Sequence, residues 1–417
     1  MSEWKCYKLN EISSLSNGIN FDKSAYTSGV KLIGVSDFKN RIHPDYDSLQ
    51  EVDSKVVKSG DYLEKGDIVF VRSNGNKELV GRCMIIDRDI PVTYSGFCIK
   101  LHLKDKKRFD PVFFNYLFKT RQFKKSMTGT AVGANIQNLS QSRLGSCEVS
   151  VPDIETQKRI AIILSRYDSL IENYQKQIKL LEEAAQRLYK EWFVDLHFPG
   201  HENTKIVDGV PEGWEKKKLI DLVDVQYGYA FDGHLFNSKE EGTPIVRIRN
   251  IPDGYTNDYT TEEANESYII NDGDILVGMD GIFHINTWSG GKAFLVQRAC
   301  SFRPKDDSMK GFILQAIYEP IKFFENTVVG ATVAHLGKKH IDSIELLVAK
   351  NVSLYKPFEK MFKERQTLKS QLRLLTEARD RLLPKLMSGE LTLEARAEKE
   401  DLLATPCKRG WEEDEAK

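Results

Sequence analysis

Two long stretches of the chain place apolar residues every three or four positions, with charged residues between them. This spacing keeps the apolar side chains on one face of an α-helix, and so narrow a stripe is typical of helices that pair as coiled coils. The pattern predicts a first helix over residues 153–198, with Asp153 as its N-cap and Pro199-Gly200 as its stop. It predicts a second helix over residues 350–389, and two such stripes in one chain are expected to pack against each other.

The second predicted helix is less regular than the first. Pro357 fits the first turn of a helix, whereas Pro384 is expected to end or kink it. Arg365 and Arg379 fall on positions of the apolar stripe, so its apolar face is interrupted twice.

The segments before the two helices, 1–152 and 211–349, have short apolar runs broken by Gly, Asn and Asp. Such runs are typical of mixed sheet and loop. Gly66-Asp67 and Gly273-Asp274 are each followed by an apolar run, which predicts a turn that leads into a buried strand. The fold class is therefore predicted to be α+β.

The domains and helices also form an internal repeat. At one constant offset Trp4 matches Trp214 and Gly18 matches Gly228, and the Gly-Asp turns and Leu-Leu pairs recur in the same order. A unit of roughly 200 residues is far longer than a solenoid repeat, so the pattern indicates a tandem duplication of a whole domain with its helix. The predicted division is domain 1–152, helix 153–198, linker 199–210, domain 211–349, helix 350–389 and tail 390–417.

The net charge of −1 hides an uneven distribution. Residues 1–152 carry +6, residues 211–349 carry a clear excess of acidic groups, and the acidic tail, predicted to be disordered, carries −4. A nucleic-acid binder usually shows a basic footprint, because neutralised phosphates supply most of its non-specific affinity. Only the first domain meets this expectation, so charge says little about the partner.

Motifs for catalysis are missing from the sequence. It contains no N/D-P-P-Y/F turn of a DNA methyltransferase, no G-x-x-x-x-G-K-[ST] phosphate loop and no H-E-x-x-H pair. The six Cys form no C-x-x-C pair, which disfavours a disulfide framework or zinc site and favours a reducing compartment. No apolar run approaches the ~18 residues of a membrane span, and no signal-like core follows the N-terminus. We expect a cytoplasmic binding protein that neither catalyses a reaction nor contacts a membrane.

Two recognition domains joined by two stiff helices would act as a ruler that reads two separated features. On DNA these features are two half-sites on one face of the duplex. The two domains differ in sequence, so their half-sites are expected to differ as well.

The order of several motifs resembles that of type I restriction–modification specificity subunits, and the resemblance spans about residues 1–393. The motifs from the start of the first domain to the start of the first helix are Trp4, Lys65-Gly66-Asp67-Ile68, Gly129-Thr130, Val151-Pro152 and Gln157-Lys158-Arg159-Ile160. Those at the ends of the repeats are Leu180-Leu181-Glu182-Glu183, Trp192-Phe193 and the run from Leu382 to Leu391. Each motif is weak alone, but their duplicated order is specific.

The resemblance implies two mixed α/β target recognition domains, separated by helices that form an antiparallel coiled coil, with a pseudo-twofold internal repeat. It implies recognition of an asymmetric bipartite site in double-stranded DNA. The family has no catalytic activity of its own and docks two methyltransferase subunits and, through them, restriction subunits. S-adenosylmethionine, ATP and Mg would belong to those partners, with no cofactor or metal on this chain.

Base reading needs polar side chains on loops beside the groove, and phosphate contacts need exposed cations. In the first domain the candidates for DNA binding are Arg72, Ser73, Asn74, Asn76 and Lys77 on a loop, Tyr94, and the basic residues Lys119, Arg121, Lys124 and Lys125. In the second they are Arg247, Arg249, Asn250, His284, Asn286, Trp288 and Lys292, with Lys338 and Lys339 as phosphate contacts. For Trp288 a packing role is an equal alternative.

The helix faces away from the apolar stripes are candidates for docking the methyltransferase subunits. The residues proposed for this role are Arg187, Tyr189, Trp192, Phe193 and Met387. Two other functions stay open at this point. One is a coiled-coil adaptor that binds proteins and no DNA, and the other is a nuclease or methyltransferase with an unrecognised motif.

Overall fold

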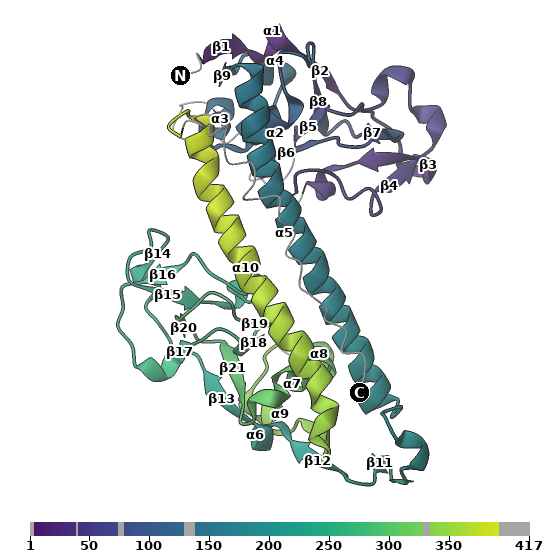
Figure 1. Ribbon diagram of the computed structural model, residues 1–417, viewed down its shortest axis with the longest axis vertical. Helices are drawn as coiled ribbons and strands as arrows, with labels where there is room; N and C mark the ends of the chain where they lie inside the picture. The colour runs from purple at the N-terminus through teal and green to yellow at the C-terminus, as the bar shows by residue number, and fades with distance from the viewer. Residues whose placement is uncertain (1–3, 39–40, 74–78, 129–137, 328–333, 392–417) are drawn as a thin grey trace, which may run out of the picture. The chain divides into compact units, whose positions relative to one another are not determined.

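The computed structural model describes residues 4–38, 41–73, 79–128, 138–327 and 334–391 (Figure 1). The chain forms two compact units. Unit 1 contains residues 1–168 and 378–417, and unit 2 contains residues 169–377. Each unit therefore combines one globular domain with a stretch of each long helix.

Unit 1 is built on a four-stranded antiparallel sheet in the order β2-β8-β5-β6. A second sheet has the order β4-β3-β7, with β3 and β7 parallel, and β1 pairs with β9. The strands are β1 Lys5–Lys8, β2 Ser13–Asn17, β3 Tyr26–Ile33, β4 Gln50–Val52, β5 Ile68–Val71, β6 Cys83–Ile85, β7 Val92–Tyr94, β8 Cys98–Leu103 and β9 Glu148–Val151. The short helices are α1 Leu9–Ile12, α2 Pro111–Lys119, α3 Arg121–Thr128 and α4 Gln141–Gly145.

Unit 2 has a four-stranded antiparallel sheet in the order β13-β21-β18-β19, a five-stranded sheet β14-β16-β15-β20-β17, and the pairs β12-β22 and β10-β11. The first strands are β10 Ile206–Val207, β11 Val210–Pro211, β12 Trp214–Lys218, β13 Val223–Tyr227, β14 Phe236–Asn237, β15 Thr243–Val246 and β16 Tyr259–Thr260. They are followed by β17 Ile269–Ile270, β18 Ile275–Gly278, β19 Ile285–Thr287, β20 Ala293–Leu295, β21 Ala299–Pro304 and β22 Glu345–Ala349. The short helices are α6 Leu219–Leu222, α7 Lys310–Ala316, α8 Tyr318–Thr327 and α9 Lys338–Asp342.

The two predicted Gly-Asp turns are present, one in each unit. Gly66 and Gly273 adopt φ values of 92° and 89°, a left-handed conformation that glycine tolerates best. β5 and β18 follow directly, and all four residues of each strand are buried. These turns place the central strand of each four-stranded sheet in the core.

A second matched pair of glycines allows two backbones to approach closely. A Cβ on Gly18 would lie 2.2 Å from the carbonyl oxygen of Tyr94, and a Cβ on Gly228 would lie 2.1 Å from that of Val296. Neither position can hold a side chain without moving the backbone. The same steric constraint therefore acts directly after β2 in unit 1 and directly after β13 in unit 2.

The first long helix, α5, is Ile154–Tyr189. Asp153 caps it as predicted, since its Oδ1 accepts a hydrogen bond from the Thr156 backbone N–H at 3.0 Å. The α-helix ends at Tyr189 and one π-helical turn follows over Lys190–Val194, so it stops earlier than predicted. The apolar spacing predicts Leu170 on the stripe, which is wrong, because Leu170 is 46% exposed while its neighbour Ile171 is buried.

The second long helix, α10, is Lys356–Met387. Pro357 lies in its first turn as predicted, and the helix continues past Pro384, which therefore does not end it. In unit 1, Leu386 of α10 is buried in the same core as Leu164 of α5. In unit 2, Phe358 of α10 packs against Phe193, which follows α5. The two helices contact each other within each unit through ion pairs, Arg379 with Asp168 in unit 1 and Arg365 with Glu182 in unit 2.

Candidate functional site

The loop after β5 was the main candidate in the first domain. Arg72 is half-buried, its backbone N–H donates to the Phe97 carbonyl at 2.8 Å, and its guanidinium lies 3.4 Å from the Gly96 carbonyl. Ser73 forms an isolated bridge with Asn138. The rest of this predicted loop, Asn74, Asn76 and Lys77, lies outside the described residues. The structure therefore positions the base of the loop against the turn between β7 and β8.

Two other candidates of the first domain serve the fold instead of the surface. Tyr94 is buried, its hydroxyl pairs with Ser16 Oγ at 2.8 Å, and burial raises its pKa to about 12. Lys119 Nζ donates to the carbonyl oxygens of Arg41 and Cys83 at 3.0 and 3.1 Å, and burial lowers its pKa. We therefore withdraw both from the DNA-binding set, because their polar atoms are engaged inside the unit.

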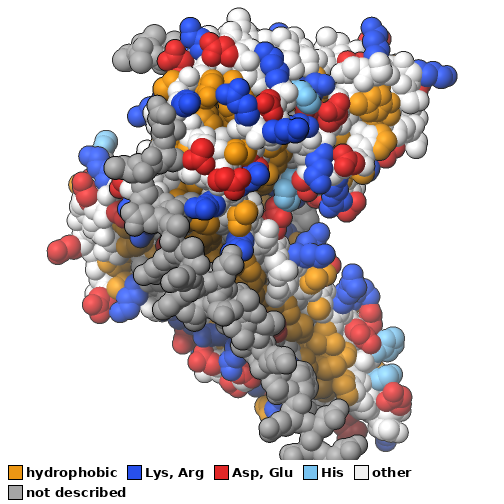
Figure 2. Space-filling view, turned by 45° about the horizontal axis from the view of Figure 1, so that its top comes forward, with side chains coloured by type: hydrophobic (Ala, Val, Ile, Leu, Met, Phe, Trp, Pro, Cys, Tyr) orange, Lys and Arg blue, Asp and Glu red, His pale blue; other side chains and the backbone are white. Residues whose placement is uncertain are grey.

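The remaining basic candidates of the first domain lie on α3. Arg121, Lys124 and Lys125 are exposed, while Phe123 and Met127 on the other face are buried. One face of α3 thus exposes cations to solvent, while its other face packs in the apolar core. In the face drawn in Figure 2, Lys and Arg side chains are interspersed with Asp and Glu among the described residues.

Three candidates of the second domain surround one carboxylate. Arg247 lies 2.7 Å from Asp258 Oδ2, Arg249 donates to both oxygens of Asp258 at 2.9 Å, and Asn250 donates to Oδ2 at 3.1 Å. Burial alone would raise the pKa of Asp258, but the hydrogen bonds from Arg247, Arg249 and Asn250 outweigh it and lower the pKa. We withdraw these three residues as base readers, because they gather on Asp258 between β15 and β16 of the five-stranded sheet and not on the loops of the four-stranded sheet.

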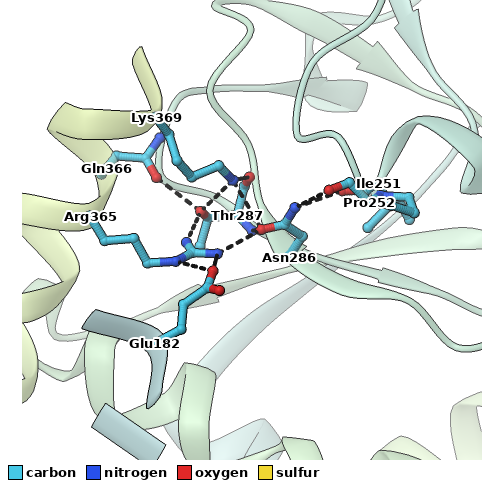
Figure 3. Close-up of polar contacts among 8 residues, drawn as sticks. All are labelled: Glu182, Ile251, Pro252, Asn286, Thr287, Arg365, Gln366 and Lys369. Carbon is cyan, nitrogen blue, oxygen red and sulfur yellow. Dashed lines mark hydrogen bonds and ion pairs between the residues drawn. The ribbon is translucent and has the colours of Figure 1, made fainter. Parts of the chain in front are cut away.

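Asn286 of β19 bonds to α10 (Figure 3), and the Trp288 carbonyl accepts a hydrogen bond from Gln366 of the same helix. The Asn286 Oδ1 accepts from Arg365 at 2.8 Å and from Lys369 at 2.9 Å, while its amide donates to the Ile251 and Pro252 carbonyls. Trp288 is fully buried, and its indole N–H donates to the Gly291 carbonyl at 2.5 Å.

The burial of Trp288 favours the packing alternative, and we withdraw Asn286 and Trp288 from the DNA-binding set. His284 is half-buried, while Lys292, Lys338 and Lys339 are exposed.

The proposed docking residues divide into a buried and an accessible group. Phe193 belongs to the core of unit 2 and Met387 to the core of unit 1, so neither offers a docking surface. Tyr189 and Trp192 are half-buried against the core of unit 2, and Arg187 is exposed. Sequence reasoning failed for Phe193 and Met387 because an aromatic or Met at a helix end fits a core as well as an interface.

The structure brings together residues that the sequence prediction left out. At the end of β18, Asp280 forms an isolated bridge with His335, and its carboxylate pairs with the side chains of His335 and Arg298. Arg298 occupies the turn before β21, where Phe97 stands before β8 in unit 1. Aligning the two repeats through these strands was the signal that would have found them.

The described residues suggest no metal centre and no membrane segment. They contain no group of three or more His, Cys, Asp or Glu side chains placed to hold a metal ion. No helix in the described ranges is long and apolar enough to cross a bilayer. Two domains that share one central sheet order and expose unlike side chains beside it are typical of modular recognition proteins.

Comparison with known proteins identifies the family. The chain matches the type I restriction modification DNA specificity domain over residues 1–183 and 211–349, and it belongs to this family. The MjaIX specificity subunit of Methanocaldococcus jannaschii is 29% identical over 300 residues, covering 67% of this chain and 68% of that protein. The HindI specificity subunit of Haemophilus influenzae is 22% identical, covering 94% of this chain and all of that protein.

A solved structure shows the same fold. The type I restriction–modification S subunit from M. genitalium superposes with a TM-score of 0.58 at 18% identity, covering 92% of this chain and 96% of that chain. The mixed α+β fold with a two-domain arrangement is therefore confirmed. The family confirms that the chain is a specificity subunit of a type I system, which is non-catalytic by itself.

Proposed function

We propose that each unit binds one half of a bipartite DNA site and that the two halves differ in sequence. One observation carries this proposal: both units contain a four-stranded sheet of the same strand order, but they expose unlike side chains beside it. A shared scaffold with different loops is suited to reading two sequences in the same geometry.

The two long helices would set the distance between the half-sites. We propose that α5 and α10 pair as an antiparallel coiled coil and that the repeats are related by a pseudo-twofold axis. Support comes from the helix contacts inside each unit, where Arg379 pairs with Asp168 and Arg365 pairs with Glu182. In such an arrangement the DNA between the two half-sites would have a fixed length, because an α-helix has a fixed rise per residue.

The exposed loops and cations would make the DNA contacts. For unit 1 we retain the loop from Arg72 to Lys77 and the α3 cations Arg121, Lys124 and Lys125. For unit 2 we retain His284, Lys292, Lys338 and Lys339. Arg72→Ala should lower methylation of the cognate site by the assembled complex, and an unchanged rate and site preference would remove Arg72 from the set.

Two methyltransferase subunits would dock on this chain, and restriction subunits would join through them. Arg187, Tyr189 and Trp192 are the accessible docking candidates. S-adenosylmethionine, ATP and Mg would be bound by those partners, and the complex would act in the cytoplasm, where the DNA lies. Copurification of the Trp192→Ala chain with a methyltransferase subunit tests the docking assignment, since unchanged assembly would remove Trp192.

Mapping methylated adenines tests the function as a whole. The full chain is coexpressed with a methyltransferase subunit in a host that lacks such a system, and the modified adenines are sequenced. We expect one asymmetric motif with two specified halves and a gap of constant length. Methylation at a single continuous motif, or in the absence of this chain, would contradict the proposal.

A further inference from the structure

A cluster of three side chains lies at the end of β18 in unit 2. Asp280 Oδ2 accepts from Arg298 Nη1 at 2.5 Å, and Asp280 Oδ1 lies 2.6 Å from His335 Nδ1. The Asp280 side chain is only 14% exposed, whereas those of Arg298 and His335 are 68% and 60% exposed. One shielded carboxylate thus holds two exposed side chains in place.

The hydrogen bonding determines what this cluster offers to a ligand. Burial alone would raise the pKa of Asp280, but the hydrogen bonds from His335 and Arg298 and the positive charge of Arg298 outweigh it and lower the pKa. An ionised carboxylate only accepts, so the proton of a neutral His335 ring resides on Nδ1. Nε2 of His335 is then an acceptor, and the remaining N–H groups of Arg298 are donors.

Stability does not explain this arrangement. Arg298 has φ 67°, a left-handed backbone conformation that is unfavourable for a bulky residue. An ion pair with an exposed partner contributes little to folding, so it does not offset that strain by much. Strained residues with exposed functional groups are more common at functional sites than elsewhere.

The same position in unit 1 supports a functional reading. The Met279 N–H donates to the Arg298 carbonyl at 2.8 Å, as the Arg72 N–H donates to the Phe97 carbonyl at 2.8 Å. The bridge between Asp280 and His335 matches the bridge between Ser73 and Asn138. Phe97 is an exposed large apolar side chain, so the two units present unlike groups at positions with the same backbone hydrogen bond. Unlike side chains at such matched positions would let the two units recognise different base sequences.

We propose that Arg298 and His335, held by Asp280, read base edges in the half-site of unit 2. Arg298 contacts a guanine through O6 and N7, and Nε2 of His335 accepts from the exocyclic amine of a neighbouring cytosine or adenine. Lys338 and Lys339, exposed a few residues after His335, contact the flanking phosphates. Asp280 is a positioning residue that touches no base. This inference rests on the proposed DNA recognition and assigns specificity to named side chains.

The test compares methylation motifs of the wild-type chain and of Arg298→Ala, each assembled with the same methyltransferase subunit. We expect the variant to lose about 5- to 150-fold of its preference for one guanine in one half-site. The other half-site serves as the internal control and should not change. Arg249→Ala is the matched control, because Arg249 is an exposed arginine on a carboxylate of the same unit. It should leave the motif unchanged.

Each outcome decides the question. If wild type shows no bipartite motif, the proposed function fails; if wild type shows one and Arg298→Ala shows the same motif, only the present inference fails. A uniform loss of methylation with unchanged base preferences would assign Arg298 to phosphate and also overturn it. If Arg298→Ala methylates nothing, selection of bound duplexes from a randomised pool by the same complex replaces the readout, with the same expectations.

A second variant separates folding from reading. Arg298→Gly removes the side chain and relieves the left-handed strain, so its unfolding temperature should be no lower than that of Arg298→Ala. It should nevertheless lose the same guanine preference. Retention of that preference in Arg298→Gly would overturn the assignment. Asp280→Asn should broaden the preference at the same base pairs while leaving the other half-site unchanged, and an unaltered motif would exclude a positioning role.

Discussion

The two units hold their stretches of α5 and α10 with opposite electrostatic designs. In unit 1 the buried group is an anion: Asp168, 7% exposed, accepts hydrogen bonds from the Tyr116 hydroxyl and from Arg379 Nη1. In unit 2 the buried groups are the cations Arg365 and Lys369, and the only carboxylate that contacts Arg365 in the described structure, Glu182, is 47% exposed.

The difference lies in what compensates the buried charge. Asp168 is matched by a full positive charge, whereas Lys369 is surrounded by neutral oxygens, with Nζ at 2.9 Å from Asn286 Oδ1 and 2.5 Å from the Thr287 carbonyl (Figure 3). Removing one member of a buried ion pair leaves an uncompensated charge, while neutral dipoles solvate a cation less completely. The stability of unit 1 should therefore depend on the ion pair of Asp168, and that of unit 2 should depend on pH through Lys369.

The largest expected effect is that of Asp168→Asn. The substitution keeps the shape of the side chain but leaves Arg379 without its buried counter-charge, so the free energy of unfolding should fall by about 3 kcal/mol. Urea unfolding measures the change, and hydrogen exchange of α2 amides locates it in unit 1. Asp380→Asn is the control, since Asp380 pairs with the same Arg379 but is exposed. Equal losses in the two variants would mean that burial of the carboxylate is unimportant.

Arg365→Met should have a smaller effect, of about 2 kcal/mol. Its guanidinium donates to Thr287 Oγ1 at 2.6 Å and to Asn286 Oδ1 at 2.8 Å, and both lose a donor in the variant. Lys369 still donates to these atoms and Glu182 remains solvated, which limits the loss. Lys363→Met, at an exposed site on the same helix, provides the control for urea unfolding. A stability equal to wild type would show that Lys369 and Gln366 suffice to anchor β19 to α10.

Lys369→Met should change stability at pH 7 least, by within about 1.5 kcal/mol, because the side chains have similar volumes and removal of a buried cation offsets the hydrogen bonds lost by Asn286 and Thr287. Its informative signature is the pH dependence. Burial lowers the pKa of Lys369 well below its ordinary value of 10.5, and the nearby charge of Arg365 lowers it further. Between the lowered pKa and 10.5 the unfolded chain binds more protons, so wild-type stability should rise with pH across that window.

This prediction is tested by the slope of the unfolding free energy against pH, and Lys363→Met is the control. Lys369→Met should lose part of the rise that wild type shows, while Lys363→Met should keep it, since the tyrosines titrate alike in all three proteins. Identical slopes in wild type and Lys369→Met would show that Lys369 stays protonated in the folded state.

Local pattern was sufficient to predict the helices, the Gly-Asp turns and the family. Spacing of apolar residues depends only on helix geometry, and local capping rules place Asp153 and Pro357 in the first turns. The second helix nevertheless begins at Lys356 and not at residue 350. The order of motifs in the two repeats is also a property of the chain alone. The interruption of the second stripe by Arg365 and Arg379 was visible as well, although its purpose was not.

The candidate site was predicted less well, because polarity does not reveal burial. Lys119 and Arg247 were assigned to the surface as cations, yet each finds oxygen partners inside its own unit. Tyr94 and Trp288 are DNA-binding candidates by residue type, with packing an equal alternative for Trp288, yet the polar atoms of both bond within the core. Arg298 and His335 were overlooked because they are far apart in sequence and meet only at Asp280.

By itself the sequence indicated the repeated motifs, the presence of the two long helices and the membership of the family, since these follow from residue order and periodicity. Tertiary structure alone decided which charged groups face inward and which side chains converge. The physical reason is that the free energy of a polar group depends on its solvent exposure and its partners. Both are set by residues that lie far away along the chain, as Asp168 with Arg379 and Asp280 with His335 illustrate.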